Sequence, residues 1–283
     1  MKMKSTANTF ADSLARQGAS KETVCSYCKS VELFYSQYDE VTVDHLLAYK
    51  AYLLEHYAVN TVNAVNARVY GLNRYLKFLE ESEQPETGCE GYRLSSVRHQ
   101  SGNYLDKVIS KKDFEKLKRR LKKDHNLKWY FIVRFLGATG VRVSELTKIK
   151  VEHVVQGCMD LCSKGRKVRR IFFPAALCEE TLEWLNSQNI SSGYIFCNRR
   201  GQQITPRGIR MQLKRFAVKY KIPEETVYPH SFRHRFALNF LSRFNDISLL
   251  ADLMGHDSIE TTKIYLTKSS GEQRALIDRV VTW

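Results

Sequence analysis

Apolar residues recur at helical spacing through the first part of the chain. Within three segments they stand three or four residues apart, which places them along one face of an α-helix. We therefore expect helices over Thr23–Tyr38, Val43–Tyr57 and Thr61–Leu79, with Ser20 as the N-cap of the first. The pattern predicts a small all-helical domain over residues 1–84.

A polar stretch interrupts this pattern. Residues 85–103 include Pro85, Gly88, Gly91 and Gly102 among Ser, Glu and Gln, and this composition is typical of loops and linkers. We interpret residues 85–103 as a linker to a second domain over residues 104–283.

The second domain opens with helical signals. Ser110 followed by Asp113 is typical of a helix N-terminus, where the two residues cap the first turn. A further helix should run through Phe131–Leu136 and end near Gly140. Helical segments should dominate from Ala176 onward.

Two β-prone runs lie between these helices. Val154–Leu161 and Val168–Phe173 are separated by the polar run Ser163–Lys167, which contains Gly165. This arrangement predicts an antiparallel hairpin with its tip at Ser163–Lys167. The expected fold class is mainly α with a small antiparallel β-sheet in the second domain.

The formal net charge of +15 is distributed unevenly. Residues 1–88 hold 9 Lys and Arg against 11 Asp and Glu, a balance of −2, whereas the remaining residues hold 36 against 19, a balance of +17. A strongly basic second part favours a polyanionic partner, above all nucleic acid. A solubilising surface is the alternative explanation of the same charge.

Other features of composition narrow the class of protein. No apolar run reaches the roughly 18 residues of a membrane span, and residues 1–21 lack the apolar centre of a signal peptide. The seven cysteines are irregularly spaced and odd in number, which makes a poor disulfide framework. Cys25 and Cys28 lack a second ligand pair, so we expect thiols there and not a metal site. We therefore expect a cytoplasmic protein that does not enter a membrane.

Four short segments of the second domain carry residues suited to phosphate chemistry. Cleaving a DNA phosphodiester without a metal requires a nucleophile in line with the leaving oxygen, positive charge to stabilise the phosphorane, and an acid for the leaving group. A phenol, arginines, histidines and a lysine can supply all three. The segments are Gly140-Val-Arg142-Val-Ser-Glu145-Leu146, Lys164-Gly165, His230-Ser-Phe-Arg233-His234, and Gly255-His256 with Tyr265 nine residues later.

Together these segments resemble the tyrosine recombinase, or phage integrase, family, whose pattern is Arg–Lys–His-x-x-Arg–His–Tyr. The order and approximate spacing match over Ser110–Thr267, and residues 1–84 resemble the family's core-binding domain by length and helical pattern. The resemblance is to Xer-like and invertase-like members that lack an arm-binding domain. The chain differs from the usual pattern at Phe232 and Met254, where leucine is commoner, and neither side chain is reactive.

The resemblance implies that Tyr265 is the nucleophile and that it forms a covalent phosphotyrosine. Arg142 and Arg233 would clamp the non-bridging phosphate oxygens, because guanidinium offers paired donors and stays charged. His230 lies three residues before Arg233, so both should share one face of a helix that starts near Ser231. The opposite face should enter the core through Phe232, Phe236, Phe240 and Phe244.

The remaining residues of the pattern would move protons. Lys164 at the hairpin tip is the candidate general acid, since arginines nearby can lower the pKa of a lysine, and Lys167 is the alternative. His230 and His256 would share protons or donate to phosphate oxygens. Glu145 would orient Lys164 or Arg142, and a plain helix-surface glutamate is the alternative.

Candidate DNA-contacting residues lie in both domains. Asn and Arg side chains on the long third helix are suited to a major groove, although solvated positions on a helix face are the alternative. In the first domain the candidates are Thr61, Asn63, Asn66, Arg68 and Arg74. In the second domain they are Arg166, Lys167, Arg169, Arg207, Arg210 and Lys214.

The resemblance further implies the partners. Double-stranded DNA would present recombination sites built from inverted-repeat half-sites, and four protomers would exchange strands through a Holliday junction. Neither a metal nor a nucleotide cofactor is expected. The C-terminal helix would contact a neighbouring protomer, because it exposes apolar residues and is too short to be stable alone. Those residues are Leu276, Ile277, Val280, Val281 and Trp283.

Two other functions are open at this point. A type IB topoisomerase would use the same chemistry to nick and relax DNA, although the segment from His256 to Tyr265 and the chain length favour a recombinase. A non-catalytic DNA-binding protein would have no need of the full set that ends in Tyr265. Among recombinase roles, we favour inversion or movement of a mobile element over chromosome resolution.

Overall fold

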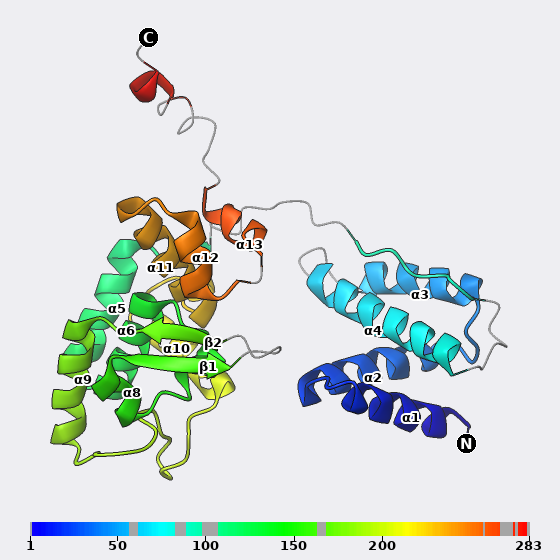
Figure 1. Cartoon of the computed structure of the whole chain (residues 1–283), viewed down its shortest axis with the longest axis horizontal. Coiled ribbons are helices and arrows are strands. Elements are labelled where there is room, and N and C mark those ends of the chain that lie inside the picture. The colour runs from blue at the N-terminus through cyan, green and yellow to red at the C-terminus, as the bar shows by residue number, and fades with distance from the viewer. Residues whose placement is uncertain are drawn as a thin grey trace. The chain divides into compact units, whose positions relative to one another are not determined.

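The computed structural model describes residues 2–56, 62–82, 89–97, 107–162, 168–256, 258–266, 274 and 277–281. The chain divides into two compact units, Met1–Gly102 and Asn103–Trp283 (Figure 1). Most of the described residues are helical, and the sheet found among them has two antiparallel strands. The fold class is therefore the one that the sequence predicts.

Helices make up the described part of the first unit. Three of them confirm the helices predicted from apolar spacing, and the Ser20 side chain accepts the Thr23 N–H at 3.2 Å as the predicted N-cap. A helix before them was not predicted, because Phe10 and Leu14 are too few buried apolar residues to show a period. The helices are α1 (Lys2–Arg16), α2 (Lys21–Tyr35), α3 (Val43–His56) and α4 (Val62–Glu81).

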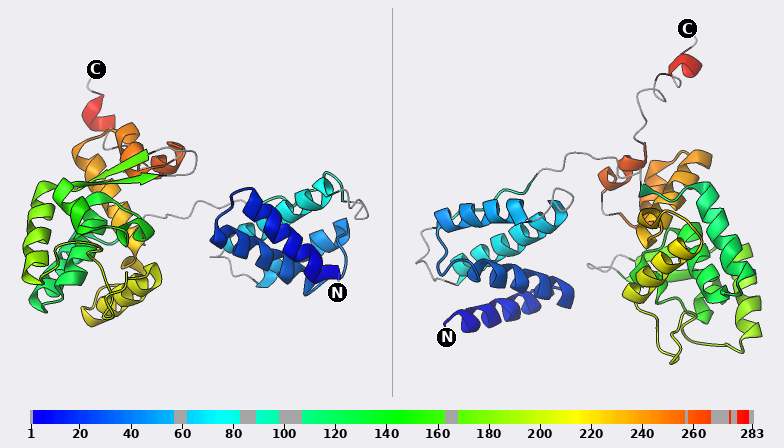
Figure 2. Two further views of the ribbon diagram at one scale, coloured as in Figure 1. Left: turned by 60° about the horizontal axis from the view of Figure 1, so that its bottom comes forward. Right: turned by 180° about the vertical axis from the view of Figure 1, so that it is seen from behind.

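Aromatic residues fill the core of this unit. Helix α2 packs between α1 and α4, and α3 packs on α4 (Figure 2). Phe34 meets Tyr49 edge to face, with ring centroids 5.3 Å apart. Gly71 lets α4 approach α2 closely, because a Cβ there would lie 2.5 Å from the Ser30 hydroxyl oxygen.

Residues 89–97 correct the predicted linker. Leu94 is buried in the core of the first unit, and Asn73 of α4 both donates to its carbonyl and accepts its N–H, each at 2.9 Å. Asn66 makes the same pair with Val97, at 3.0 and 2.8 Å. Side-chain amides replace the partner strand that this extended segment lacks, so the segment belongs to the first domain. We call residues 89–97 the strap.

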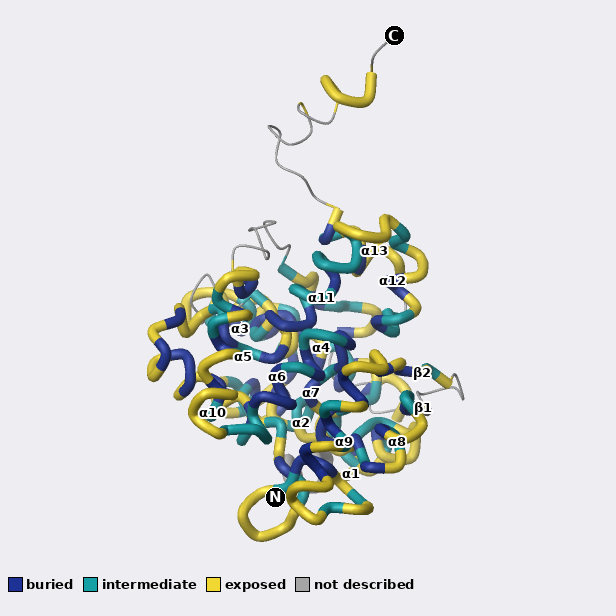
Figure 3. The backbone as a smooth tube through the Cα atoms, turned by 90° about the vertical axis from the view of Figure 1, so that its left-hand side faces the viewer, coloured by how far each residue is buried: buried dark blue, intermediate teal, exposed yellow. Residues whose placement is uncertain are grey.

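The second unit opens with the predicted helical signals. Ser110 accepts the Asp113 N–H at 3.0 Å and donates to its carboxylate at 2.8 Å, which caps α5 (Lys111–Lys123). Helix α6 (Leu127–Thr139) ends, as predicted, at Gly140, whose φ of 62° is left-handed. Helix α6 is apolar on almost every side and is therefore buried at the centre of the core (Figure 3).

A hairpin follows two short helices, α7 (Val143–Leu146) and α8 (Val151–Gln156). Strand β1 (Cys158–Cys162) pairs antiparallel with β2 (Val168–Phe172), so the hairpin is confirmed. Its predicted first strand began too early, because Val154 lies in α8, which buries two valines one helical turn apart and ends at Gly157 with φ 70°. The predicted tip at Ser163–Lys167 lies outside the described residues.

Helices make up most of the rest of the second unit. Helix α12 contacts α11, α13 and β2, and α11 packs on α6, so α12 stands beside the hairpin (Figure 1). Phe232 on α11 is fully buried, whereas Phe244 is 55% exposed, which corrects the expectation that all four phenylalanines face the core. The elements are α9 (Ala175–Ser187), α10 (Pro206–Lys219), η3 (Glu224–Thr226), α11 (Pro229–Arg243), α12 (Ile247–Met254), α13 (Glu260–Lys263) and η4 (Ile264–Leu266).

No helix in the described ranges is long and apolar enough to cross a membrane. Cys25 is exposed and Cys28 is partly buried, and both thiols are free. No group of three or more His, Cys, Asp or Glu that could hold a metal occurs within the residues that the structure describes.

Candidate active site

The C-terminal end of α12 gathers three arginines. Helix ends leave carbonyls without intrahelical partners, and the negative end of the helix dipole favours cations. The arginines come from β2, from α11 and from the turn before α7, so α12 joins residues that are distant in sequence. Leu253 O accepts from Arg169 at 2.8 Å, Gly255 O from Arg142 at 2.7 Å, and Met254 O from Arg233.

Glu145 balances part of this charge. Its carboxylate accepts from Arg142 Nη1 at 2.9 Å, from Arg169 Nη1 at 3.0 Å and from the Arg142 backbone N–H at 2.8 Å. Burial alone would raise the pKa of Glu145, but these hydrogen bonds and charges hold it below its ordinary value. Glu145 is thus ionised and oriented toward Arg142, one of the two partners expected for it.

The three arginines differ in exposure. The side chain of Arg142 is 38% exposed and that of Arg169 is 12% exposed, while Arg233 is 4% exposed. Burial and the positive charges of Arg142 and Arg169 lower the pKa of Arg233 to about 10. An anion bound among these groups would relieve their mutual repulsion. Arg169 corrects a prediction, because it is held inside the unit and is not a surface DNA contact.

Two glycines allow this close packing. Gly255 has φ 62°, and a Cβ there would collide with the Arg169 side chain. Gly140 also has φ 62°, and a Cβ there would lie 2.5 Å from Phe236 Cδ1. Both positions need a left-handed conformation and an absent side chain, so glycine satisfies them with least strain.

Tyr265 lies in η4 and is 7% exposed. Its ring belongs to a buried cluster with Ala237, Leu250 and Met254. Burial raises the pKa of Tyr265 to about 12, while the charge of Arg233 acts in the opposite direction. The phenol is therefore protonated in this structure, and it lies within the electrostatic reach of the arginine cluster.

Two histidines flank the arginines. His256 Nδ1 lies 2.7 Å from the Thr262 hydroxyl oxygen, and burial together with the charge of Arg233 lowers the pKa of His256 to about 4. His230 keeps an exposed face on α11, and burial of the rest of its ring lowers its pKa, as do the charges of Arg233 and Arg210. Both imidazoles are neutral at pH 7.

The structure thus connects five of the residues predicted to be catalytic. Their contacts and charges link Arg142, His230, Arg233, His256 and Tyr265 around the end of α12. Lys164 lies outside the described residues, as do Thr61, Arg166 and Lys167.

The DNA-contact candidates on α4 are partly used inside the first unit. Asn66 is a correction, because it is buried and holds the strap through Val97. Arg74 donates to Gln17 and lies 4.0 Å from Glu81. Arg68 donates to the Ser30 hydroxyl at 3.5 Å, and Asn63 is exposed.

The candidates on α10 are arranged differently. Arg207, Arg210 and Lys214 are all exposed, and their spacing of three and four residues puts them on one face of the helix. The charge of Arg210 lowers the pKa of His230, as do the charges of Arg233 and Arg142. This face of α10 is therefore close enough to His230 to act on it together with the arginine cluster.

Sequence reasoning missed two residues of this site. Arg169 was named only as a DNA-contact candidate, and its inward position in β2 follows from the hairpin register, which the sequence does not fix. His234 stands in the quoted His-x-x-Arg-His motif without a role, yet its Nδ1 lies 2.7 Å from the Tyr265 hydroxyl. The motif was the available signal for His234.

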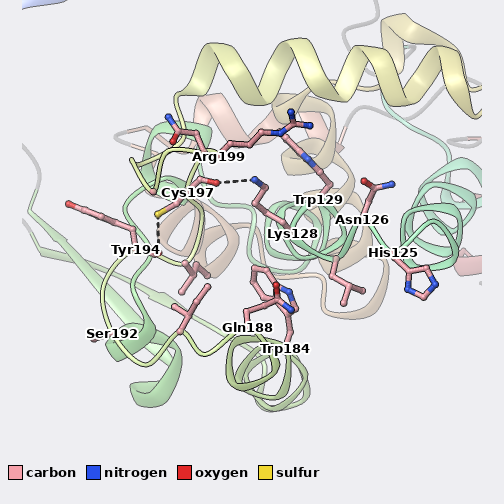
Figure 4. Close-up of a pocket in the computed structure, with 15 residues that line it drawn as sticks. His125, Asn126, Lys128, Trp129, Trp184, Gln188, Ser192, Tyr194, Cys197 and Arg199 are labelled. Carbon is pink, nitrogen blue, oxygen red and sulfur yellow. Dashed lines mark hydrogen bonds between the residues drawn. The ribbon is translucent and has the colours of Figure 1, made fainter.

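A pocket between α6 and α9 lies apart from this cluster (Figure 4). Trp129 and Trp184 line it together with Lys128, whose amine points to the Cys197 carbonyl and donates to it at 2.9 Å. The pocket shares no residue with the arginine cluster, and its lysine already has a hydrogen-bond partner. We therefore assign the chemistry to the end of α12.

Comparison with known proteins identifies the family of the chain. Residues 107–272 match the phage integrase family. Tyrosine recombinase XerA of Pyrococcus furiosus is 30% identical over 277 residues, which are 95% of this chain and 92% of that protein.

Solved structures share the fold. The Tn1549 transposon integrase in complex with transposon right-end DNA matches with a TM-score of 0.72 and 15% identity, over 98% of this chain and 99% of that chain. The XerH site-specific recombinase bound to a palindromic difH substrate matches with a TM-score of 0.71 and 18% identity, over 94% and 81%. The chain therefore belongs to the phage integrase family and is a tyrosine-type site-specific recombinase.

Proposed function

We propose that Tyr265 attacks a DNA phosphate and forms a covalent 3′-phosphotyrosine, from which the strand is later rejoined. The observation that carries this proposal is the gathering of Arg142 and Arg233 at the end of α12, with Tyr265 within the electrostatic reach of Arg233. In the attack, the phenol oxygen bonds to phosphorus, its proton passes to the neutral imidazole of His230 or His256, and the bond from phosphorus to the 5′ oxygen breaks. The covalent link conserves the bond energy, so rejoining needs no ATP.

Arg142 and Arg233 stabilise the charge on the non-bridging oxygens. Their guanidinium groups offer paired donors that match phosphate geometry. Arg233 is held by the carbonyls of Gly140 and Met254 before DNA arrives, so it needs little reorganisation during the reaction. The more exposed Arg142 is placed to meet the phosphate first.

Lysine and histidine side chains handle the protons. Lys164 donates a proton to the departing 5′ oxygen. His230 and His256 are neutral without DNA, because burial and the arginines lower their pKa values. A bound phosphate adds negative charge beside them and raises both pKa values, so each becomes a better hydrogen-bond donor to the phosphate.

Double-stranded DNA with inverted-repeat half-sites is the proposed substrate. The second unit is the catalytic domain, and the exposed basic face of α10 supports a phosphate-contacting role for Arg207, Arg210 and Lys214. The first unit is the core-binding domain. We expect the protein to act in the cytoplasm, in inversion or in movement of a mobile element.

The end of the chain supports assembly on DNA. Ile277 and Val280 are 57% and 54% exposed in a helical segment, and Val281, directly after it, is 41% exposed. Large apolar side chains that are exposed together favour burial against a protein surface. We expect the segment to dock on a neighbouring protomer when four protomers hold two sites and exchange strands through a Holliday junction.

Trapping a covalent adduct tests the proposed chemistry. The target is first obtained by selecting bound duplexes from a random-sequence pool. A nicked version of that site loses a short strand after cleavage, so religation stops and the adduct accumulates on a denaturing gel. We expect an adduct with the wild-type protein in excess EDTA and without ATP, because Arg142, Arg233 and Lys164 supply the charge and the acid.

The Tyr265→Phe variant is the matched control, because the ring keeps its packing and only the hydroxyl is lost. Its adduct should fall by more than about a thousandfold while DNA affinity is nearly kept. An adduct in this variant would place the nucleophile elsewhere, and a strict Mg²⁺ requirement for cleavage would contradict the mechanism. Rapid relaxation of a plasmid without the selected site would favour a topoisomerase.

A further inference from the structure

The Tyr265 hydroxyl has a hydrogen-bond partner to which the family pattern gives no role. His234 Nδ1 lies 2.7 Å from this hydroxyl, and the ring centroids are 5.5 Å apart. His234 directly follows the buried Arg233 on α11, and η4 packs on α11. One turn of α11 therefore carries both the proposed phosphate clamp and the contact to the proposed nucleophile.

The contact joins two uncharged groups. Burial, the charge that His230 carries when protonated and the charge of Arg233 lower the pKa of His234 to about 4, while burial raises that of Tyr265 to about 12. Proton transfer from the phenol to the imidazole is therefore disfavoured, so His234 is not a base in this state. A neutral imidazole has one protonated and one unprotonated nitrogen, so Nδ1 and the phenol hydroxyl form a hydrogen bond whose donor is set by the tautomer.

Tyr265 depends on such an anchor because of where it lies. Helix η4 spans three residues, Ile264–Leu266, and 3₁₀ turns have weaker hydrogen-bond geometry than α-helices. Leu250 and Met254 pack against the ring, but apolar contacts are non-directional and do not fix the position of the hydroxyl. The hydrogen bond to His234 provides that direction.

We propose that His234 is a positioning residue, whose Nδ1 holds the Tyr265 oxygen in register with the phosphate that Arg233 binds. The inference rests on the proposed role of Tyr265 as the nucleophile. In-line displacement is sensitive to geometry, because a displacement of about 1 Å can cost about 100-fold in rate. Arg233 and His234 are adjacent on α11. Because one binds the phosphate and the other binds the Tyr265 hydroxyl, the helix fixes the distance between the phosphate and the nucleophile.

Three substitutions separate hydrogen bonding from packing. Asparagine at position 234 places a polar side-chain atom near the position of Nδ1, glutamine places one near Nε2, and alanine removes both. Single-turnover cleavage should fall about 100-fold in His234→Ala and His234→Gln but stay within about tenfold of wild type in His234→Asn. DNA affinity should change by less than about twofold in all three. Equal rates in the three variants would overturn the inference.

A modified substrate separates positioning from proton donation. Sulfur in place of the 5′ bridging oxygen leaves as a thiolate, which needs no proton because the pKa of a thiol is about 8.5. This substrate should restore a variant that lacks the general acid, but it should leave His234→Ala slow, because the nucleophile is still misplaced. Restored cleavage in His234→Ala would overturn the positioning role.

A measurement without DNA tests the contact between His234 and Tyr265 separately from DNA cleavage. In the ¹⁵N spectrum of the histidine side chains, Nδ1 of His234 should shift in Tyr265→Phe, because that variant removes the hydrogen-bond partner of Nδ1. An unchanged resonance would overturn the positioning role whether or not the protein cleaves DNA. Conversely, a covalent adduct formed by Tyr265→Phe would overturn the proposed function even if the resonance shifts.

Discussion

The two units use their polar side chains in different ways. In the first unit, Asn66 and Asn73 of α4 are bonded to the strap, and each satisfies both backbone groups of one residue. In the second unit, Arg142 and Arg233 bind carbonyls at the end of α12, and the charge of Arg233 reaches Tyr265. The amides complete the fold, whereas the arginines are fixed by the fold and still have capacity for an anion.

This difference shows when a polar residue on a helix predicts function. The side-chain amide of Asn66 uses its oxygen and its nitrogen to bind the backbone of Val97. The sequence does not reveal this structural use of the side chain. A cluster of arginines around one carboxylate leaves unbalanced positive charge, because Glu145 faces three guanidinium groups. The unbalanced charge is what indicates an anionic ligand.

After the loss of the Tyr265 hydroxyl, the largest effect should come from exchanging arginine for lysine at the α12 cluster. Lysine cannot provide the paired guanidinium donors, so Arg142→Lys and Arg233→Lys should each slow cleavage by about 100- to 1000-fold. The two variants should differ in stability. Arg142 is 38% exposed, so its loss should cost less than about 1 kcal/mol. Arg233 is buried between Gly140 O and Met254 O, so its loss should cost about 1–3 kcal/mol.

Urea unfolding and single-turnover cleavage measure the two quantities separately. Arg142→Lys and Arg233→Lys make the same chemical change at two positions, so each variant serves as the control for the other. If both lost the same stability, Arg233 would not have the structural role that its carbonyl contacts indicate. If either cleaved at the wild-type rate, the phosphate clamp would be wrong at that position.

Much of the second unit could be predicted because its constraints are local or chemical. The cap at Ser110, the helix end at Gly140 and the hairpin all depend on a few neighbouring residues. The catalytic candidates could be named because a fixed order of reactive side chains is rare. The sequence could not place Arg169, because its contact with Leu253 spans 84 positions and requires the folded α12.

The errors in the first unit have a related cause. The strap looks like a linker because it is polar and contains Gly91, and its place was decided by Asn66 and Asn73 on a helix far away in sequence. Helix α1 was missed because periodicity is weak where Phe10 and Leu14 carry the buried face. In both cases long-range packing overrides the local pattern.

A smaller effect should separate structural from DNA-contacting polar residues. Asn66→Ala leaves the N–H and carbonyl of Val97 without their partner, so the free energy of unfolding should fall by about 1–3 kcal/mol. DNA affinity, measured where the variant is folded, should be nearly unchanged. Arg210→Ala should show the reverse, with stability kept and affinity reduced about three- to tenfold.

The salt dependence of binding provides the second readout for this pair. If Arg210 contacts a phosphate, its loss should reduce the slope of log affinity against log salt by about 1, and Asn66→Ala should leave the slope unchanged. If Asn66→Ala lost much DNA affinity while its free energy of unfolding stayed unchanged, Asn66 would contact the DNA groove, as the sequence predicts. An unchanged slope in Arg210→Ala would contradict a contact between this face of α10 and the DNA phosphates.

The smallest effect concerns acid, and it also distinguishes the units. In the second unit the pKa values of His234 and His256 are lowered to about 4, and unfolded histidine titrates near 6.5. Between these values the unfolded chain binds more protons, so the free energy of unfolding rises with pH. This stability is fully present above about pH 6.5 and is lost as pH falls toward about 4. In the first unit the Glu80–Arg93 pair lowers the pKa of Glu80 to about 2, so its contribution persists until pH falls below about 4.5.

The second unit should therefore weaken first on acidification, by about 1 kcal/mol between pH 7 and pH 6 after allowing for solvent screening. Tryptophan fluorescence can follow it, because the three tryptophans of the chain all lie after residue 102, and hydrogen exchange of peptides from residues 1–82 can follow the first unit. Replacing both histidines by asparagine, which does not titrate, should flatten the dependence between pH 6.5 and pH 5. A second unit that became more stable on acidification over this range would mean that these imidazoles are protonated in the folded protein, and the neutral hydrogen bond between His234 and Tyr265 would then be excluded.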